Sequence, residues 1–153
     1  MNPCTGRGIA LTRGSAQPTV REISDTSFVS LDENVLIAEA AKTLYEREAD
    51  CIIVTRNDAK MGVRIPVGIV TQRDIIFRVV AQNKGPFKVT LVSIMTSPVT
   101  VIDHRSPIRE ALEVMKKGGF SRLPVVTETG EIIGLVTMEM VVRKVPLKKI
   151  SQA

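Results

Sequence analysis

Apolar and polar residues follow one another along this chain in two successive patterns that match. A shift of 71 positions aligns the beginnings of the two patterns, and a shift of 66 aligns Gly68–Thr71 with Gly134–Thr137. The difference of five places an insertion in the polar stretch 56–60 of the first copy, where a longer loop costs little free energy. Six identical pairs carry the first alignment: Ile23 and Ile94, Asp32 and Asp103, Ile37 and Ile108, Glu39 and Glu110, Ala40 and Ala111, and Val54 and Val125.

Each copy is predicted to fold in the order β-α-β-β-α. Apolar residues three and four positions apart indicate helices, whereas short apolar runs between turn residues indicate strands. In the second copy, Ser106 is a candidate N-cap, Pro107 suits the first helical turn, and Gly118-Gly119 ends the helix. The predicted strands are 28–31, 51–55 and 65–70 in the first copy and 99–102, 123–127 and 132–136 in the second.

The two copies are expected to pack as one α+β body with pseudo-two-fold symmetry. A unit of about 55 residues buries little core alone, so its apolar sheet face needs the other copy. A cleft is expected at the seam between the copies. The expected boundaries are a flexible basic segment 1–17, a first repeat 18–82, a linker 83–90, a second repeat 91–146 and a basic tail 147–153.

The net charge of +5 is distributed unevenly along the chain. Residues 1–21 and 143–153 hold seven Lys and Arg and no acid, whereas all sixteen acidic residues lie in 22–142 beside fourteen basic ones. A nucleic-acid-binding domain usually concentrates positive charge on one folded face. We therefore expect solvated basic termini, and nucleic-acid contact through these tails stays an alternative.

The composition excludes several classes of protein. Hydrophobic residues make up 44% of the chain and charged residues 24%, which is typical of a globular domain. No apolar run approaches the roughly 18 residues that cross a bilayer, and Cys4 and Cys51 lack metal-ligand spacing. A cytoplasmic protein without membrane contact, disulfide or metal site is expected.

The sequence also lacks the residue sets that hydrolases need. His104, the sole histidine, lies in a polar turn where capping or solvent exposure is expected, and Cys51 lies in an apolar strand. No nucleophile, base and orienting acid combine, and no phosphate-binding glycine loop of the G-x-x-x-x-G-K-[ST] type occurs. We therefore expect no catalytic activity.

Three segments carry a resemblance to a known family. They are Ser93–Val99 before a strand, Phe120–Val126 in the middle of the second copy, and Gly68–Asp74 at the end of the first. In this order, the duplicated unit resembles a tandem pair of cystathionine-β-synthase (CBS) domains, often called a Bateman module, over residues 18–146. The resemblance implies a regulatory module that binds AMP, ADP, ATP or S-adenosylmethionine in the cleft, frequent homodimers, and no resident cofactor.

The resemblance assigns the ribose of the ligand to Asp74. A carboxylate can accept hydrogen bonds from both ribose hydroxyls, and Ile69, Thr71 and Arg73 would line the same pocket. The spacing of Thr71 and Asp74 is also that of a capping box, in which both side chains bond backbone N–H groups at the helix start. Both interpretations are open at this stage.

The second copy would complete this pocket. The resemblance implies that Val99 and Thr100 contact the adenine beside Pro124, and that Arg122 binds the phosphates through its planar guanidinium. The alternative for Arg122 is an ordinary surface arginine.

A second, weaker pocket is also expected, with Phe28, Val29 and Thr137 in the matching positions. Met140 replaces the ribose acid there, and Cys51 stands where the second copy has Arg122. Loss of a charge-assisted hydrogen bond should weaken binding by about 1.5–3 kcal/mol.

The sequence therefore favours an adenine-nucleotide sensor that changes the packing of its copies or of a homodimer. The remaining alternative is a structural oligomerisation module that binds no small molecule. Its contacts would come from the apolar residues Val141, Val142 and Val145.

Overall fold

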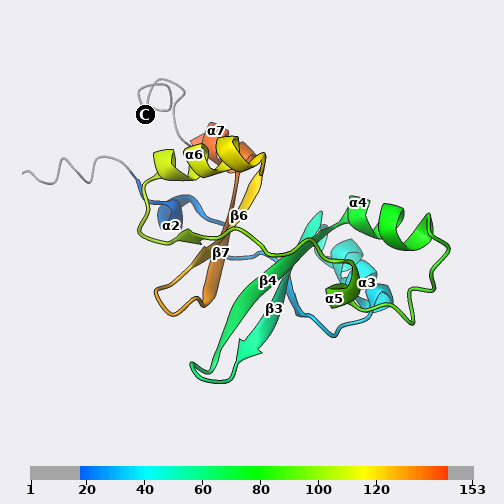
Figure 1. Ribbon diagram of the computed structural model, residues 1–153. Helices are drawn as coiled ribbons and strands as arrows, with labels where there is room; N and C mark the ends of the chain where they lie inside the picture. Colours follow the sequence, from blue (N-terminus) through cyan, green and yellow to red (C-terminus); the bar gives the residue numbers. More distant parts are fainter. Residues whose placement is uncertain (1–17, 145–153) are drawn as a thin grey trace, which may run out of the picture.

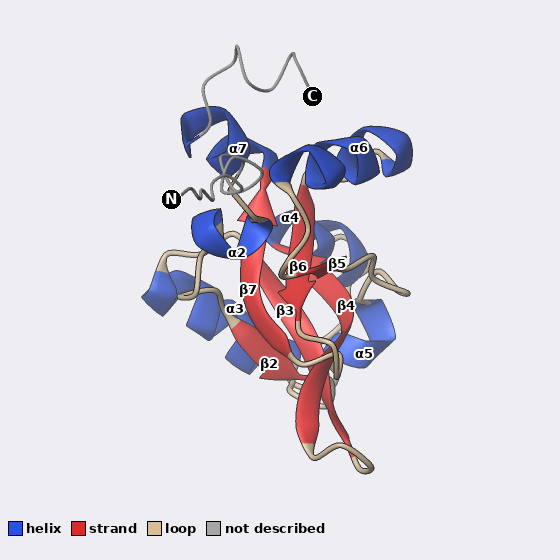
Figure 2. Ribbon diagram, turned by 90° about the vertical axis from the view of Figure 1, so that its left-hand side faces the viewer, coloured by secondary structure: helices blue, strands red, loops and turns tan. Residues whose placement is uncertain are grey.

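Two sheets of three strands form the centre of the protein (Figures 1 and 2). The computed structural model describes residues 18–144, so the predicted segment 1–17 and tail 147–153 lie outside the described residues. The sheets have the orders β2-β3-β4 and β5-β6-β7, and in each the first pair is parallel and the second antiparallel. The α+β class and the two-fold repetition are therefore confirmed.

The elements of the first copy begin with a short helix that the β-α-β-β-α prediction did not include. They are α2 (Val20–Ile23), β2 (Ser30–Asp32), α3 (Ile37–Arg47), β3 (Cys51–Asp58), β4 (Val63–Thr71), α4 (Gln72–Ile75) and the π-helical turn η1 (Ile76–Val80). The second copy repeats this order. Its elements are α5 (Leu91–Ile94), β5 (Ile102–Asp103), α6 (Ile108–Gly118), β6 (Arg122–Val126), β7 (Ile132–Thr137) and α7 (Met138–Lys144).

The two short helices α2 and α5 are exchanged between the copies. Val20 and Ile23 of α2 are buried in the core of the second copy with Met115. Leu91 and Ile94 of α5 are buried in the core of the first copy. Figure 1 shows α2 beside β6 and β7, and α5 beside α3 and β4. Each core therefore needs a segment from the other half of the chain.

The segment after each exchanged helix crosses the last strand of the opposite copy. Asp25 and Leu135 bond each other's backbone at 2.8 and 3.0 Å, as do Ile69 and Thr96 at 3.1 and 3.0 Å. At the crossings, a Cβ on Gly134 would lie 2.6 Å from the Ser24 Oγ, and one on Gly68 would meet the Met95 side chain. A side chain at Gly134 would collide with Ser24, whereas at Gly68 it would displace the flexible Met95 side chain.

The start of α6 corrects the predicted cap. Pro107, not Ser106, is the N-cap residue, and no side chain caps the helix. The Ile108 N–H instead donates to the Pro18 carbonyl at 3.3 Å, because the exchanged segment before α2 covers this helix end. The predicted C-terminus is confirmed, since Gly119 ends the helix with φ of 70°.

The first strand of each copy begins later than predicted. The residue pairs with β3 and β6 begin at Ser30 in the first copy and at Ile102 in the second. Directly before Ser30, the Val29 carbonyl accepts from the Ile53 N–H at 2.9 Å and the Val29 side chain is buried in the first core, while Phe28 packs against Cys51, Ile53 and Leu135.

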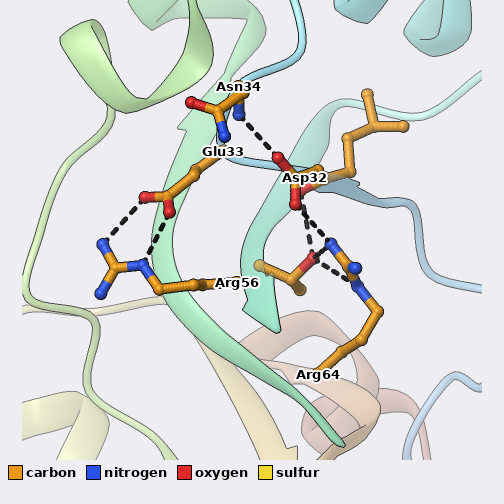
Figure 3. Close-up of polar contacts among 7 residues, drawn as sticks. Asp32, Glu33, Asn34, Arg56 and Arg64 are labelled. Atoms are coloured by element: carbon orange, nitrogen blue, oxygen red, sulfur yellow. Dashed lines mark hydrogen bonds and ion pairs between the residues drawn. The ribbon is translucent and has the colours of Figure 1, made fainter. Parts of the chain in front are cut away.

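The predicted insertion lengthens the hairpin of β3 and β4, which projects from the rest of the molecule (Figures 1 and 2). Two arginine–carboxylate pairs lie beside these strands (Figure 3). Arg56 donates to both oxygens of Glu33 at 2.7 and 2.8 Å. Arg64 donates to Asp32 at 3.1 Å and to the buried Thr55 hydroxyl at 2.7 Å. These contacts tie the hairpin to β2 and the turn that follows it.

A small apolar cluster fills the seam. Cys51, Ile53 and Leu135 are buried there, with Phe28 and Ile69 packed against them. Cys51 is therefore a core residue, as expected. Among the helices of the described residues, none has the length and apolarity needed to cross a membrane.

Candidate functional site

A cavity of about 660 Å³ opens at the seam. The first copy contributes Phe28, Val29 and Cys51 to its wall, and the second contributes Arg122 and Thr137. This is the pocket that the sequence predicted as the weaker of two, and all three residues named for it line the cavity. Met140, which replaces the ribose acid in the repeat pattern, lines it as well.

The strand starts explain why these side chains meet. Cys51 and Arg122 are the first residues of β3 and β6, and each pairs with a threonine at the end of the neighbouring strand, Thr71 or Thr137. In each copy a helix begins directly after that threonine. Polar groups from strand starts and helix starts are therefore gathered at the seam.

Arg122 joins the two copies through an ion pair. Its Nη2 donates to the Asp50 Oδ2 at 2.7 Å, and the Arg122 side chain is 29% exposed against 66% for Asp50. Partial burial lowers the pKa of Arg122. The hydrogen bond to Asp50 and the neighbouring Cys51 raise it, and the pKa of Arg122 lies above its ordinary value as a result. Burial raises the pKa of the Cys51 thiol, while the nearby Arg122 opposes this change. Arg122 is thus a partly buried, paired cation and not an ordinary surface arginine.

Two more arginines line the cavity, and both have partners. Arg47 donates to the Ser27 carbonyl at 3.0 Å, and Arg143 pairs with Glu139 one helical turn away at 2.6 Å. The carboxylates in the cavity wall are Asp25, Glu48, Asp50 and Glu139. The cavity wall therefore carries both signs of charge.

Sequence reasoning missed most of these charged residues. Asp50 could have been identified from the repeat, because the shift of 71 places it opposite Ser121. Ser121 directly precedes Arg122, which the sequence did predict for the site. Arg47 and Glu48 have no such signal, since they look like the solvated end of a helix.

The structure forms the capping box at Thr71 and Asp74. The Thr71 N–H donates to the Asp74 Oδ2 at 2.9 Å, and the Asp74 N–H donates to the Thr71 hydroxyl at 3.2 Å. The other carboxylate oxygen of Asp74 lies 3.7 Å from the Arg78 Nε, and the side chain is 18% exposed. A ribose bound here would share this carboxylate with the cap and with Arg78.

Most of the residues predicted for the main pocket do not line the described cavity, although Ile69 packs against the buried cluster that includes Cys51 and Leu135 of its wall. Of the eight, only Arg122 lines it. Pro124 is buried in β6, Val99 and Thr100 precede β5, and Arg73 lies over the Phe77 ring at 4.7 Å. Arg122 reaches the cavity because its strand start lies at the seam, opposite Asp50 of the first copy.

The sequence predicts a capping or solvent-facing role for His104, but its side chain neither caps α6 nor faces solvent. Its side chain is 13% exposed, and its Nε2 lies 3.6 Å from the Glu128 carboxylate. Its Nδ1 lies 3.4 Å from the Arg21 guanidinium, because α2 packs over this turn. Within residues 18–144, no group of three or more His, Cys, Asp or Glu could hold a metal ion.

The duplicated fold and the cavity lined by both copies define a protein built from a tandem pair of small α+β domains. The sequence profile of the CBS domain matches residues 20–81 and 91–147, and the chain therefore belongs to the CBS domain family.

Two solved structures share this architecture. The CBS domain protein PAE2072 from Pyrobaculum aerophilum, complexed with AMP, is 28% identical, with a TM-score of 0.73 over 88% of this chain and 99% of that one. The CBS domain pair of protein MJ0100, in complex with 5′-methylthioadenosine and S-adenosyl-L-methionine, is 29% identical. Its TM-score is 0.70 over 86% of this chain and 98% of that one.

Curated relatives are longer proteins. Uncharacterized protein MK0525 of Methanopyrus kandleri is 38% identical over 81 aligned residues. These residues make up 53% of this chain and 41% of that protein. The chain spans 20% of CBSCBSPB1, a CBS domain-containing protein of Arabidopsis thaliana. It spans 23% of a homoserine O-acetyltransferase of Methanohalobium evestigatum, at 30% identity. CBS pairs of this kind therefore occur within larger chains, one of them named as an enzyme.

Proposed function

We propose that this CBS pair is a regulatory, non-catalytic module that binds one adenosine-containing ligand in the seam cavity. The observation that carries the proposal is the cavity itself, which both copies line. Its volume of about 660 Å³ falls within the range of small-molecule sites, roughly 300–1,000 Å³. The AMP complex of PAE2072 and the two adenosyl ligands of MJ0100 support the ligand class.

The cavity wall offers suitable groups for each part of such a ligand. Phe28 and Val29 supply an apolar surface for the adenine, and the Thr137 hydroxyl lies at the start of α7. The guanidinium groups of Arg47 and Arg122 can face a charged 5′ group. A ligand that contacts both copies favours the arrangement in which they lie together, and this shift is the proposed signal.

Filling the cavity tests this proposal. Ser121 is an exposed residue of the cavity wall, so Ser121→Trp adds a large ring there while leaving the core intact. We expect it to weaken binding of AMP, ADP or 5′-methylthioadenosine at least about tenfold, since the ring occupies ligand volume. Isothermal titration calorimetry measures each affinity, and Thr129→Trp in the β6–β7 turn is the matched control.

A second variant distinguishes the seam cavity from the pocket predicted at Asp74. Asp74→Asn removes the charge and keeps one acceptor oxygen for the cap. If this variant loses the ligand while Ser121→Trp retains it, the ligand sits at Asp74 and not in the seam cavity. If no adenosine compound binds the wild-type protein, the sensor function is wrong.

A homodimer is part of the proposal. Ile76, Phe77 and Val80 of η1 are at least half exposed, so this face is available to a second copy. The structural-module alternative has less support, because Val141 is fully buried in the second core while Val142 is half exposed. Val145 and the basic tails of the nucleic-acid alternative lie outside the described residues.

A further inference from the structure

The ion pair between Asp50 and Arg122 has a consequence for which ligands the cavity accepts. This inference rests on the proposed adenosine site. Asp50 directly precedes β3 and Arg122 begins β6, so the pair connects the two copies at 2.7 Å inside the cavity wall. Because the Asp50 carboxylate already accepts from the Arg122 Nη2, an anionic 5′ group that approaches this side of the guanidinium competes with Asp50 for it.

The two partners differ in their freedom to separate. Arg122 is 29% exposed and pairs through β6 with Thr137, whereas Asp50 is 66% exposed at the edge of the cavity. The Asp50 side chain can therefore turn into solvent at small cost, and Arg122 can stay in the wall. A carboxylate that stays near a phosphate also repels it, so a 5′ anion meets competition for the cation and repulsion by the acid.

We propose that Asp50 is a specificity-determining residue, which competes with the 5′ anionic group of an adenosine ligand for Arg122. It lowers the affinity for nucleoside di- and triphosphates relative to adenosyl compounds with an uncharged 5′ group. An uncharged group leaves the ion pair in place, whereas a phosphate separates it and releases one connection between the copies.

The cavity contains a matched control for this effect. Glu139 also pairs with an arginine of the wall, Arg143, but both belong to α7 and are at least 70% exposed. Glu139→Gln removes the same charge from the same cavity without freeing a partly buried cation. Exposed pairs of this type contribute little, so we expect less than a twofold change in affinity.

The test uses ADP and 5′-methylthioadenosine as probes in isothermal titration calorimetry. Asp50→Asn should bind ADP about fivefold more tightly than the wild type, because Arg122 is free for the phosphates. Its affinity for 5′-methylthioadenosine should change less than twofold. In a protein that already carries Arg122→Gln, Asp50→Asn should alter the ADP affinity less than twofold. The reason is that the arginine for which Asp50 and the phosphates compete is absent. Thermal unfolding without ligand verifies that each variant is folded.

Three outcomes overturn the inference and leave the sensor function in place. In the first, the wild type binds 5′-methylthioadenosine, but Asp50→Asn does not bind ADP more tightly. In the second, Glu139→Gln raises the ADP affinity as much as Asp50→Asn does. In the third, Asp50→Asn still raises the ADP affinity when Arg122 is replaced by Gln. Binding of neither probe by the wild-type protein overturns the proposed function itself.

Discussion

Close backbone crossings at single residues hold the two copies in register. Gly68 and Gly134 occupy equivalent positions in β4 and β7, and each lies against the segment that follows the other copy's exchanged helix. The neighbours differ, because Gly68 faces a flexible methionine side chain whereas Gly134 faces Ser24 next to the Asp25 backbone. A side chain is therefore tolerated less well at Gly134.

Gly134→Ala should lower the free energy of unfolding by about 1–3 kcal/mol, as overpacking of a tight site does. The added Cβ would lie 2.6 Å from the Ser24 Oγ and 3.0 Å from its Cβ, so the crossing must shift. Urea unfolding followed by circular dichroism measures the loss. Gly85→Ala is the control, because a Cβ there meets nothing within 4 Å. Equal stability of the two variants would mean that the crossing is loose.

At the scale of elements, the insertion changes how the first copy is stabilised. β3 and β4 have eight and nine residues, against five and six in β6 and β7. The longer hairpin extends beyond the core, where apolar burial is small, and ion pairs to Asp32 and Glu33 connect it to the rest (Figure 3). The Asn34 backbone N–H and Arg64 lower the pKa of Asp32, and the hydrogen bond from Arg56 lowers the pKa of Glu33.

These shifts predict acid sensitivity of the hairpin. Because the folded-state pKa of Asp32 lies below its ordinary value of 3.8, its contribution is complete above that pH and disappears as pH falls through the folded pKa. Asp32→Asn keeps an acceptor for the Asn34 N–H and should reduce the fall in unfolding free energy between pH 5 and pH 2. The effect should be at most about 1 kcal/mol, since the pair is exposed. Urea unfolding at several pH values measures it, with Glu46→Gln as control. An unchanged slope in Asp32→Asn would contradict the assignment.

At the scale of the whole molecule, exchange of α2 and α5 makes each core depend on both halves of the chain. Val20 and Ile23 complete the second core, and Leu91 and Ile94 complete the first. Since the seam cavity lies between these cores, its shape depends on the same exchange. A ligand in the cavity and a mutation in α5 therefore act on one cooperative unit.

Leu91→Ala tests this dependence. Leu91 is fully buried in the first core, so its truncation should cost about 2–5 kcal/mol, whereas Val92→Ala on the same helix alters a side chain that is 39% exposed. Hydrogen exchange should show the larger loss of protection in β3 and β4, which precede Leu91 by about 20 residues or more. A loss confined to β6 and β7 would contradict the exchanged packing.

Much of the fold followed from residue order. The apolar period of Ile108, Ala111 and Met115 predicted a helix that the structure confirms, with Gly119 at its end. The matched segments Gly68–Thr71 and Gly134–Thr137 correctly placed equivalent strand ends, and the polar stretch 56–60 marked the longer hairpin. Ser106 failed as a cap because a distant carbonyl, that of Pro18, satisfies the helix start instead.

Comparison of the two copies in the sequence identified part of the cavity wall. Phe28, Val29 and Thr137 occupy repeat positions that a comparison of the copies identifies, and they line one cavity. Met140 lines the cavity at the repeat position of Asp74, and the weaker binding expected there stays a prediction. The repeat could have indicated both positions, but the ion pair between Asp50 and Arg122 could not be foreseen, because the two residues lie 72 positions apart in sequence.

The sequence by itself determined the duplication, the β-α-β-β-α order within each copy and the presence of Met140 at the repeat position of Asp74, because these depend on spacing along the chain. Tertiary structure alone decided that α2 and α5 change places and that Arg122 meets Asp50 across the seam. These contacts join segments that come together only when both cores have formed, so burial and charge pairing select them rather than local propensity.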